Sequence, residues 1–155
     1  MKNVLNLLKC RIEDRKDNSH CWAIVNTGNV IDSCKNKLAL LAGVDIDDIT
    51  VDVEHMLPEN KKNRLSSMYY RETHDGKIRH SFNITLYIQY WFNRNSNMSK
   101  YEYIEHILTV LVAELISAEK CRNHMSNDIN ENLKAAKHII KNNIYIVNNA
   151  YLQYR

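Results

Sequence analysis

Two long amphipathic stretches in the last third of the chain constrain its fold more than any other sequence feature. Ser99 and Glu102 have the spacing of a capping box, which predicts a helix that starts at Ser99 and ends near Asn123. Its apolar residues recur at alternating spacings of four and three, the period of one helical face: Ile104, Leu108, Leu111, Leu115 and Ala118.

A second apolar stripe starts near Asp128 and predicts another long helix. Because only a short polar link joins the two stretches, we expect two antiparallel helices over residues 99–153 that bury both stripes. The second stripe consists of Ile129, Leu133, Ala136, Ile140, Ile144, Val147 and Tyr151.

The first part of the chain also has helical periodicity. Apolar residues at helical spacing predict helices over residues 3–13 and 29–42, the latter ending before Gly43. Residues 21–25 fit either the front of a longer helix or a short strand. The N-terminal region, residues 1–43, is therefore predicted to be helical.

The middle of the chain changes to strand periodicity. From Ile49 to Glu54 apolar and polar residues alternate, which is typical of a half-buried strand. Asp75-Gly76 lies between two strand-like runs and predicts a hairpin turn. We therefore expect an α+β fold that is mostly helical, with a small β-hairpin or ββα-like element in residues 49–97. At 155 residues the chain suits one domain.

Composition limits the classes of function. A formal net charge of +3 permits a polyanionic partner without requiring one. No apolar run is long enough for a membrane span, and polar residues interrupt the start of the chain where a signal peptide is apolar, so we expect a cytoplasmic protein without a membrane partner. Four cysteines without a CxxC pair predict buried thiols. Abundant Asn, Lys, Ile and Tyr suggest an AT-rich phage or mobile element.

The segment most suited to chemistry is Glu54-His55-Met56-Leu57-Pro58. It places a carboxylate beside a histidine at the predicted strand end, just before the only proline of the chain. Such a pair can perform acid-base or metal chemistry. The alternative is a surface strand end that Pro58 turns, with no catalytic role.

Two motifs resemble the HNH nuclease superfamily, in particular the HNH domain of GmrSD-type, modification-dependent restriction enzymes. Glu54-His55-Met56-Leu57-Pro58 is similar to the first motif of that family, and Asn83-Ile84-Thr85-Leu86 is similar to a motif about thirty residues later. An Asn-rich stretch, residues 93–97, follows. The resemblance covers residues 51–97 and implies a ββα-metal site.

The resemblance implies a role for each matched residue. His55 would be the general base that deprotonates the attacking water, and Asn83 would orient it. Asn93 would supply the third motif, for which Asn95 and Asn97 are alternatives. Glu54 and Asn97 would bind the divalent metal, Mg²⁺ or Mn²⁺. Tyr69, Tyr70 and Trp91 would pack against sugar or base. Basic residues of the same segment would contact DNA phosphates: Lys61, Lys62, Arg64, Arg71, Lys77 and Arg79.

Two functions of different classes follow from the sequence. The first is a metal-dependent HNH-like endonuclease that hydrolyses DNA phosphodiester bonds. The alternative is a non-enzymatic, mostly helical protein that binds a host protein as an inhibitor or regulator. In either case the C-terminal helices, with Tyr145, Tyr151 and Tyr154, are candidates for a homodimer interface.

Three further patterns offer weaker alternatives. Cys121 and His124 have a spacing that zinc accepts, with Cys10, His20 or Cys21 as remote partners. Arg15 and His20 have the Arg-x4-His form of helical HEPN ribonucleases. Carboxylates and a histidine on the helix over 99–123 resemble a helical metal site, although their spacing fits a solvated face better: Glu102, Glu105, His106, Glu114 and Glu119.

Overall fold

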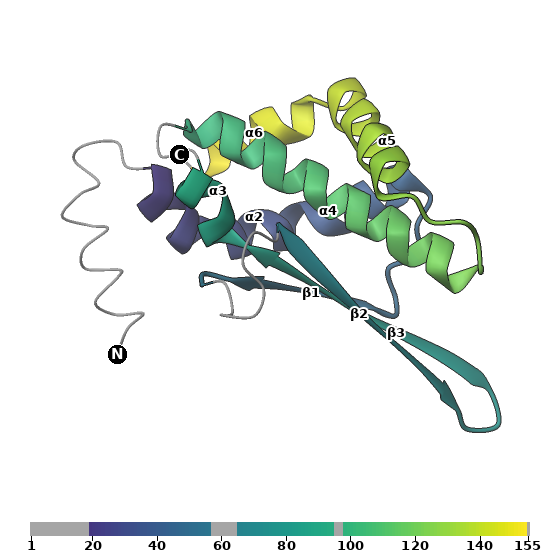
Figure 1. Cartoon of the computed structure of the whole chain (residues 1–155). Coiled ribbons are helices and arrows are strands. Elements are labelled where there is room, and N and C mark those ends of the chain that lie inside the picture. Colours follow the sequence, from purple (N-terminus) through teal and green to yellow (C-terminus); the bar gives the residue numbers. More distant parts are fainter. Residues whose placement is uncertain (1–18, 57–64, 95–97, 155) are drawn as a thin grey trace.

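The computed structural model describes residues 19–56, 65–94 and 98–154, with the side chains of 78 and 92–94 left out. This part of the chain contains five helices and one three-stranded sheet, which confirms the mostly helical α+β fold (Figure 1). In chain order the elements are α2 (Ser19–Ala42), β1 (Ile49–Glu54), β2 (Ser66–His74), β3 (Ile78–Tyr87), α3 (Ile88–Arg94), α4 (Lys100–Arg122), α5 (Ile129–Asn142) and α6 (Tyr145–Gln153).

The sheet has the strand order β1-β3-β2. Strands β2 and β3 form the antiparallel hairpin that Asp75-Gly76 predicts, and Gly76 has the positive φ of 73° that such a turn favours. Strand β1 pairs with β3 in parallel, from Ile49 opposite Phe82 to Glu54 opposite Tyr87. The sequence did not reveal this parallel pairing, because strand periodicity carries no information about which strands are neighbours.

The described elements form three layers (Figure 1). Helices α2 and α4 pack on one face of the sheet, and α5 and α6 pack on the side of these helices that lies away from it. The other face of the sheet, called here the outer face, carries none of the described helices. One hydrophobic cluster joins all three layers, with contributions from Leu38, Phe82, Ile84, Leu108, Leu111, Ala136, Ile140 and Val147.

The helices follow the sequence pattern with two differences. Residues 21–25, which fitted helix or strand, belong to α2. The second C-terminal stripe forms two helices, since helical structure is interrupted at Asn143 and Ile144, between α5 and α6. The capping box is confirmed, since the Ser99 side chain accepts a hydrogen bond from the Glu102 amide at 3.1 Å. The helix expected over 3–13 lies outside the described residues.

Arg122 anchors the end of α4 to the loop that leads into β1. Its guanidinium donates to both carboxylate oxygens of Asp48 and to the carbonyl of Asp45 at 2.9 Å, and it also pairs with Glu119. The same group lies 5.3 Å from the centre of the Phe82 ring. This arrangement fixes where β1 starts relative to the helical layer.

Three of the four cysteines lie in the part of the chain that the structure describes. Cys21 and Cys34 are buried, Cys121 is half-buried, and none of these three forms a disulfide. Burial raises the pKa of the Cys34 thiol. Within residues 19–56, 65–94 and 98–154, no helix combines the length and hydropathy that a membrane span needs.

Candidate functional site

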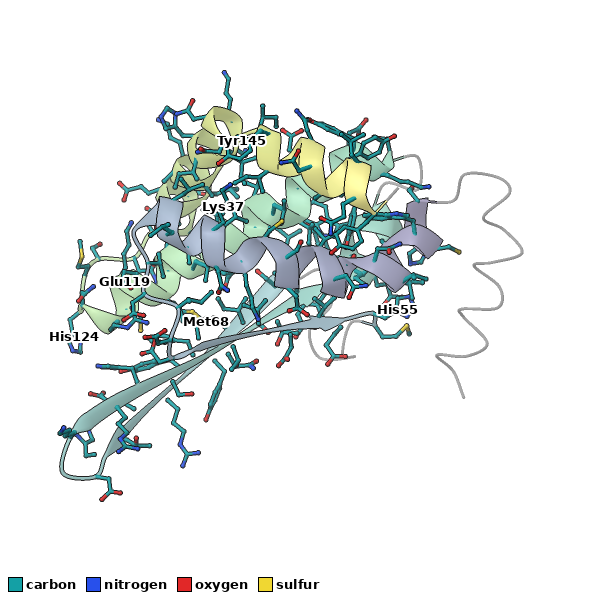
Figure 2. The ribbon with its side chains drawn as sticks, turned by 180° about the vertical axis from the view of Figure 1, so that it is seen from behind. Lys37, His55, Met68, Glu119, His124 and Tyr145 are labelled. Carbon is teal, nitrogen blue, oxygen red and sulfur yellow. The ribbon has the colours of Figure 1, made fainter. Side chains whose placement is uncertain are left out.

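Glu54 and His55 lie on different sides of the sheet. Along β1 the residues with even numbers, ending in Glu54, are exposed on the outer face, while the odd ones pack toward the helices. His55 continues the inner series and lies beside the start of α2, with its ring centre 5.6 Å from that of His20 (Figure 2). The two side chains therefore do not converge on one cation-sized gap.

The environment of His55 is that of a partly enclosed ring. Its Nε2 atom is shielded from solvent and has no hydrogen-bond partner among the described residues. Burial lowers the pKa of His55 below its ordinary value of 6.5, because a charged imidazolium loses hydration there. Its backbone carbonyl accepts from the Gln89 amide at 3.1 Å, which ties the end of β1 to the start of α3.

Asn83 holds β1 to β3 and does not reach His55. Its side-chain amide donates to Thr50 Oγ1 at 2.9 Å and to Asp52 Oδ2 at 2.8 Å. In the parallel register Asn83 is opposite Thr50, and His55 lies five residues further on, about 16 Å along the strand. The Asn83 side chain thus links the two strands on the outer face, and the orienting role that the resemblance implies for it stays a prediction.

The other residues of the expected metal site are only partly described. Asn93 lies on α3, without a described side chain, while Asn95 and Asn97 fall outside the described residues. Within the described part of the chain, no three His, Cys, Asp or Glu side chains are placed to hold a metal ion. The same search included the carboxylates of α4 and Cys121 with His124, His20 and Cys21, whereas Cys10, the other candidate zinc partner, lies outside the described residues. Arg15 of the Arg-x4-His pattern also lies outside them.

Three of the six predicted phosphate contacts are described, and all three lie on the β2–β3 hairpin. Arg71 is opposite Ser81 and Arg79 is opposite Thr73, so the two arginines are diagonal neighbours on the outer face. Both are exposed, as is Lys77 after the turn. The remaining three, Lys61, Lys62 and Arg64, fall outside the described residues.

The hairpin presents different chemistry on its two faces. On the inner face Tyr70 is hydrogen-bonded to His80 Nδ1 at 2.7 Å, and Glu72 lies 3.8 Å from His74 Nε2. Glu72 therefore points away from the arginines. Tyr69, which is 69% exposed, adds a phenol to the outer face. Because the hairpin projects past the helical layers, this face is accessible along its length (Figure 1).

The outer face changes in charge from one end to the other. Asp52 and Glu54 on β1 make the end near α3 acidic, while the hairpin end has a positive net charge, from Arg71, Arg79 and Lys77 against Asp75 of the turn. Polar side chains connect the two ends, with Thr85 donating to Asn83 at 3.2 Å and Ser67 hydrogen-bonded to Tyr87 at 3.0 Å. We call the basic part, formed by Tyr69, Arg71, Lys77 and Arg79, the hairpin surface.

The tyrosines expected at a dimer interface have partners within the chain. The Tyr151 ring packs edge-on against Tyr101 with centres 5.7 Å apart, and the Tyr154 carbonyl accepts from the Trp22 indole. Tyr145 is 43% exposed and has the Lys37 ammonium 4.6 Å from its ring centre. A homodimer through these helices stays a prediction.

Comparison with known proteins adds no further assignment. The chain gave no significant match to protein-family models, to curated protein sequences or to solved structures.

Proposed function

We propose that this protein binds duplex DNA through the hairpin surface. The observation that carries this proposal is the position of Arg71 and Arg79, which are diagonal neighbours on the outer face of an exposed hairpin. Guanidinium groups bind phosphate oxygens with two parallel hydrogen bonds, and Lys77 adds a third positive charge near the turn.

The shape of the hairpin suits this partner. A two-stranded ribbon fits the width of the DNA major groove, and its basic side chains then reach the phosphates on the groove edges. The exposed phenol of Tyr69 can donate to a phosphate oxygen. Glu72 does not oppose binding, since it lies on the inner face beside His74.

Phosphodiester hydrolysis is not part of this proposal. A metal-dependent nuclease needs the metal ligand and the general base on the same phosphate, whereas Glu54 and His55 lie on opposite sides of β1. Two predictions from the sequence form part of the proposed function: DNA as the partner, and phosphate contacts by Arg71, Lys77 and Arg79.

A fluorescence anisotropy titration tests the proposal. We expect the wild-type chain to bind a labelled duplex of about two helical turns, and Arg71→Gln/Arg79→Gln to weaken binding at least tenfold at 0.1 M salt, about the effect of one or more lost phosphate contacts. The matched control is Lys35→Gln/Lys100→Gln, which removes the same charge from α2 and α4.

The control distinguishes a local contact from a general charge effect. We expect it to bind within about twofold of wild type, because the two lysines lie on neither hairpin strand. Equal binding by the arginine variant and the control would overturn the proposal. Circular dichroism melting of each variant checks that it folds.

A further inference from the structure

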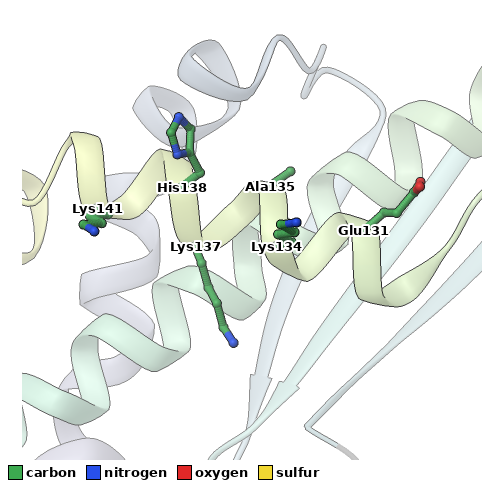
Figure 3. A pocket seen from close by; sticks show the side chains of 6 residues that line it. All are labelled: Glu131, Lys134, Ala135, Lys137, His138 and Lys141. Atoms are coloured by element: carbon green, nitrogen blue, oxygen red, sulfur yellow. The ribbon is translucent and has the colours of Figure 1, made fainter.

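Helix α5 carries a second basic surface. Lys134, Lys137 and Lys141 are exposed at spacings of three and four, so that they fall on one side of the helix (Figure 3). The first and last of these residues are about 10 Å apart along the helix axis. We call these three residues the lysine stripe.

In the described part of the chain, one acidic residue borders the lysine stripe. Among the described residues, none of the three lysines forms an ion pair, and Glu131 is the one carboxylate that borders the hollow around the stripe. His138 lines the same hollow and is hydrogen-bonded to Asn142 at 2.9 Å. The hollow is lined by α5 alone, so it is an open surface and does not enclose a small ligand.

The buried side of α5 explains why the lysines stay exposed. Ala136 and Ile140 pack against the core, and Asn132 is buried, where it accepts from Lys120 at 2.7 Å. This amphipathic arrangement fixes the rotation of the helix. The stripe is therefore held on a rigid element rather than on a loop.

The lysine stripe and the hairpin surface are on opposite sides of the molecule. Helix α5 packs on the side of α4 away from the sheet (Figure 1). The register of the hairpin places Arg71 and Arg79 on the outer face of the sheet. The helical layer of α2 and α4 lies between them. One straight duplex does not reach both surfaces.

We propose that the lysine stripe is a second DNA-phosphate site and that the protein bridges two duplexes. The bridging rests on the proposed function for the first duplex, whereas binding at α5 does not. Three ammonium groups on one helical face match a run of phosphates on one strand, and each contact releases a bound counterion. The expected contacts carry no sequence information.

An anionic membrane is the competing partner for such a stripe. Membrane-bound helices combine the basic face with large apolar side chains that enter the bilayer. Around the lysine stripe the lining residue without a polar side chain is Ala135, which is too small for that role, and the exposed Ile129 at the start of α5 does not line the hollow. The observations therefore favour DNA.

The experiment measures bridging directly. Two duplexes, one with a donor and one with an acceptor dye, are mixed with the wild-type chain, and we expect energy transfer that rises and then falls with protein concentration. Lys134→Gln/Lys141→Gln should reduce the maximal transfer at least tenfold while binding to a single labelled duplex stays within about threefold of wild type. Lys35→Gln/Lys100→Gln is again the control.

The outcomes separate the two proposals. Duplex binding without energy transfer, or transfer that survives in the Lys134→Gln/Lys141→Gln variant, would overturn bridging through α5 and leave the hairpin proposal intact. Weaker duplex binding by Arg71→Gln/Arg79→Gln, with a remaining component that Lys134→Gln/Lys141→Gln removes, would support both sites. Lysine-dependent binding to phosphatidylserine vesicles with no lysine-dependent DNA contact would also overturn the inference.

Discussion

Glu54 and His55 are consecutive in the chain and occupy opposite sides of the sheet, with Glu54 exposed on the outer face and His55 beside His20. Strand β1 ends at Glu54, and His55, the first residue after it, continues the two-residue alternation of the strand. An acid-histidine pair in a strand is therefore divided by the geometry that the strand imposes. The two residues should respond differently to substitution.

Substitution of Glu54 and His55 tests this separation. Glu54→Gln removes a negative charge from the outer face, so we expect DNA binding to strengthen about twofold and the free energy of unfolding to change by less than about 0.5 kcal/mol. His55→Ala should leave DNA binding unchanged and cost about 1 kcal/mol of stability, because the half-enclosed ring is lost. Mg²⁺-dependent plasmid cleavage that either change abolishes would contradict this account.

The lowered pKa of His55 predicts a pH dependence of stability. The unfolded chain binds a proton near pH 6.5, whereas folded His55 resists protonation until a lower pH. The contribution of neutral His55 to the free energy of unfolding is therefore fully present above pH 6.5. It is lost as the pH falls through the pKa of His55 in the folded protein. Melting temperatures measured between about pH 7.5 and pH 4.5 should fall less steeply in His55→Asn than in wild type. Parallel curves would refute the assignment.

Glu114 should oppose folding at neutral pH. Burial raises its pKa above the ordinary value of 4.5, although the Ser66 hydroxyl partly offsets this. A raised carboxyl pKa means that its contribution is favourable below about pH 4.5 and is lost as the pH rises through the folded pKa. Glu114→Gln should therefore stabilise the protein by about 1 kcal/mol at pH 7.

An exposed glutamate on the same helix provides the control for this change. Glu105→Gln removes the same charge from α4, and we expect it to alter the free energy of unfolding by less than about 0.5 kcal/mol. Urea denaturation at pH 7 and at pH 4 distinguishes the two variants. A Glu114→Gln variant less stable than wild type at pH 7 would show that the carboxylate is better stabilised than its burial indicates.

Substitution of Arg122 should lower the stability of the protein more than substitution of most other polar residues. Its side chain is 14% exposed and joins Asp48, Asp45 and Glu119 around the start of β1. Arg122→Ala removes the donor to Asp48 and to the Asp45 carbonyl, while Glu119 keeps bonds from the Asp45 amide and Asn123, and we expect a loss of about 2 kcal/mol. Arg122→Lys should recover less than half, since one ammonium does not replace the guanidinium fork. Full recovery by lysine would contradict the geometry.

Local sequence patterns correctly predicted the features that are set by residues close together in the chain. The alternation from Ile49 to Glu54 is β1, the Asp75-Gly76 pair is the hairpin turn, and Ser99 with Glu102 caps α4. In each case the interacting groups are within a few residues of one another, so their pattern is visible in one dimension.

The arrangement of the candidate site depends on strand pairing between residues that are far apart in the sequence. The parallel register of β1 with β3 places Asn83 beside Thr50, and no local pattern specifies this contact. The same register separates Asn83 from His55. By contrast, the hairpin pairing that places Arg71 and Arg79 on the same face can be derived from the turn position, because the side chains of each strand alternate between the two faces from Asp75-Gly76 onward.

The salt dependence of duplex binding tests the hairpin surface most directly. A plot of log association constant against log salt has a slope of about −0.9 per phosphate contact, so Arg71→Gln/Arg79→Gln should reduce the magnitude of the slope by about 2. Lys35→Gln/Lys100→Gln should leave it at the wild-type value. Identical slopes for wild type and the arginine variant would contradict DNA binding through the hairpin.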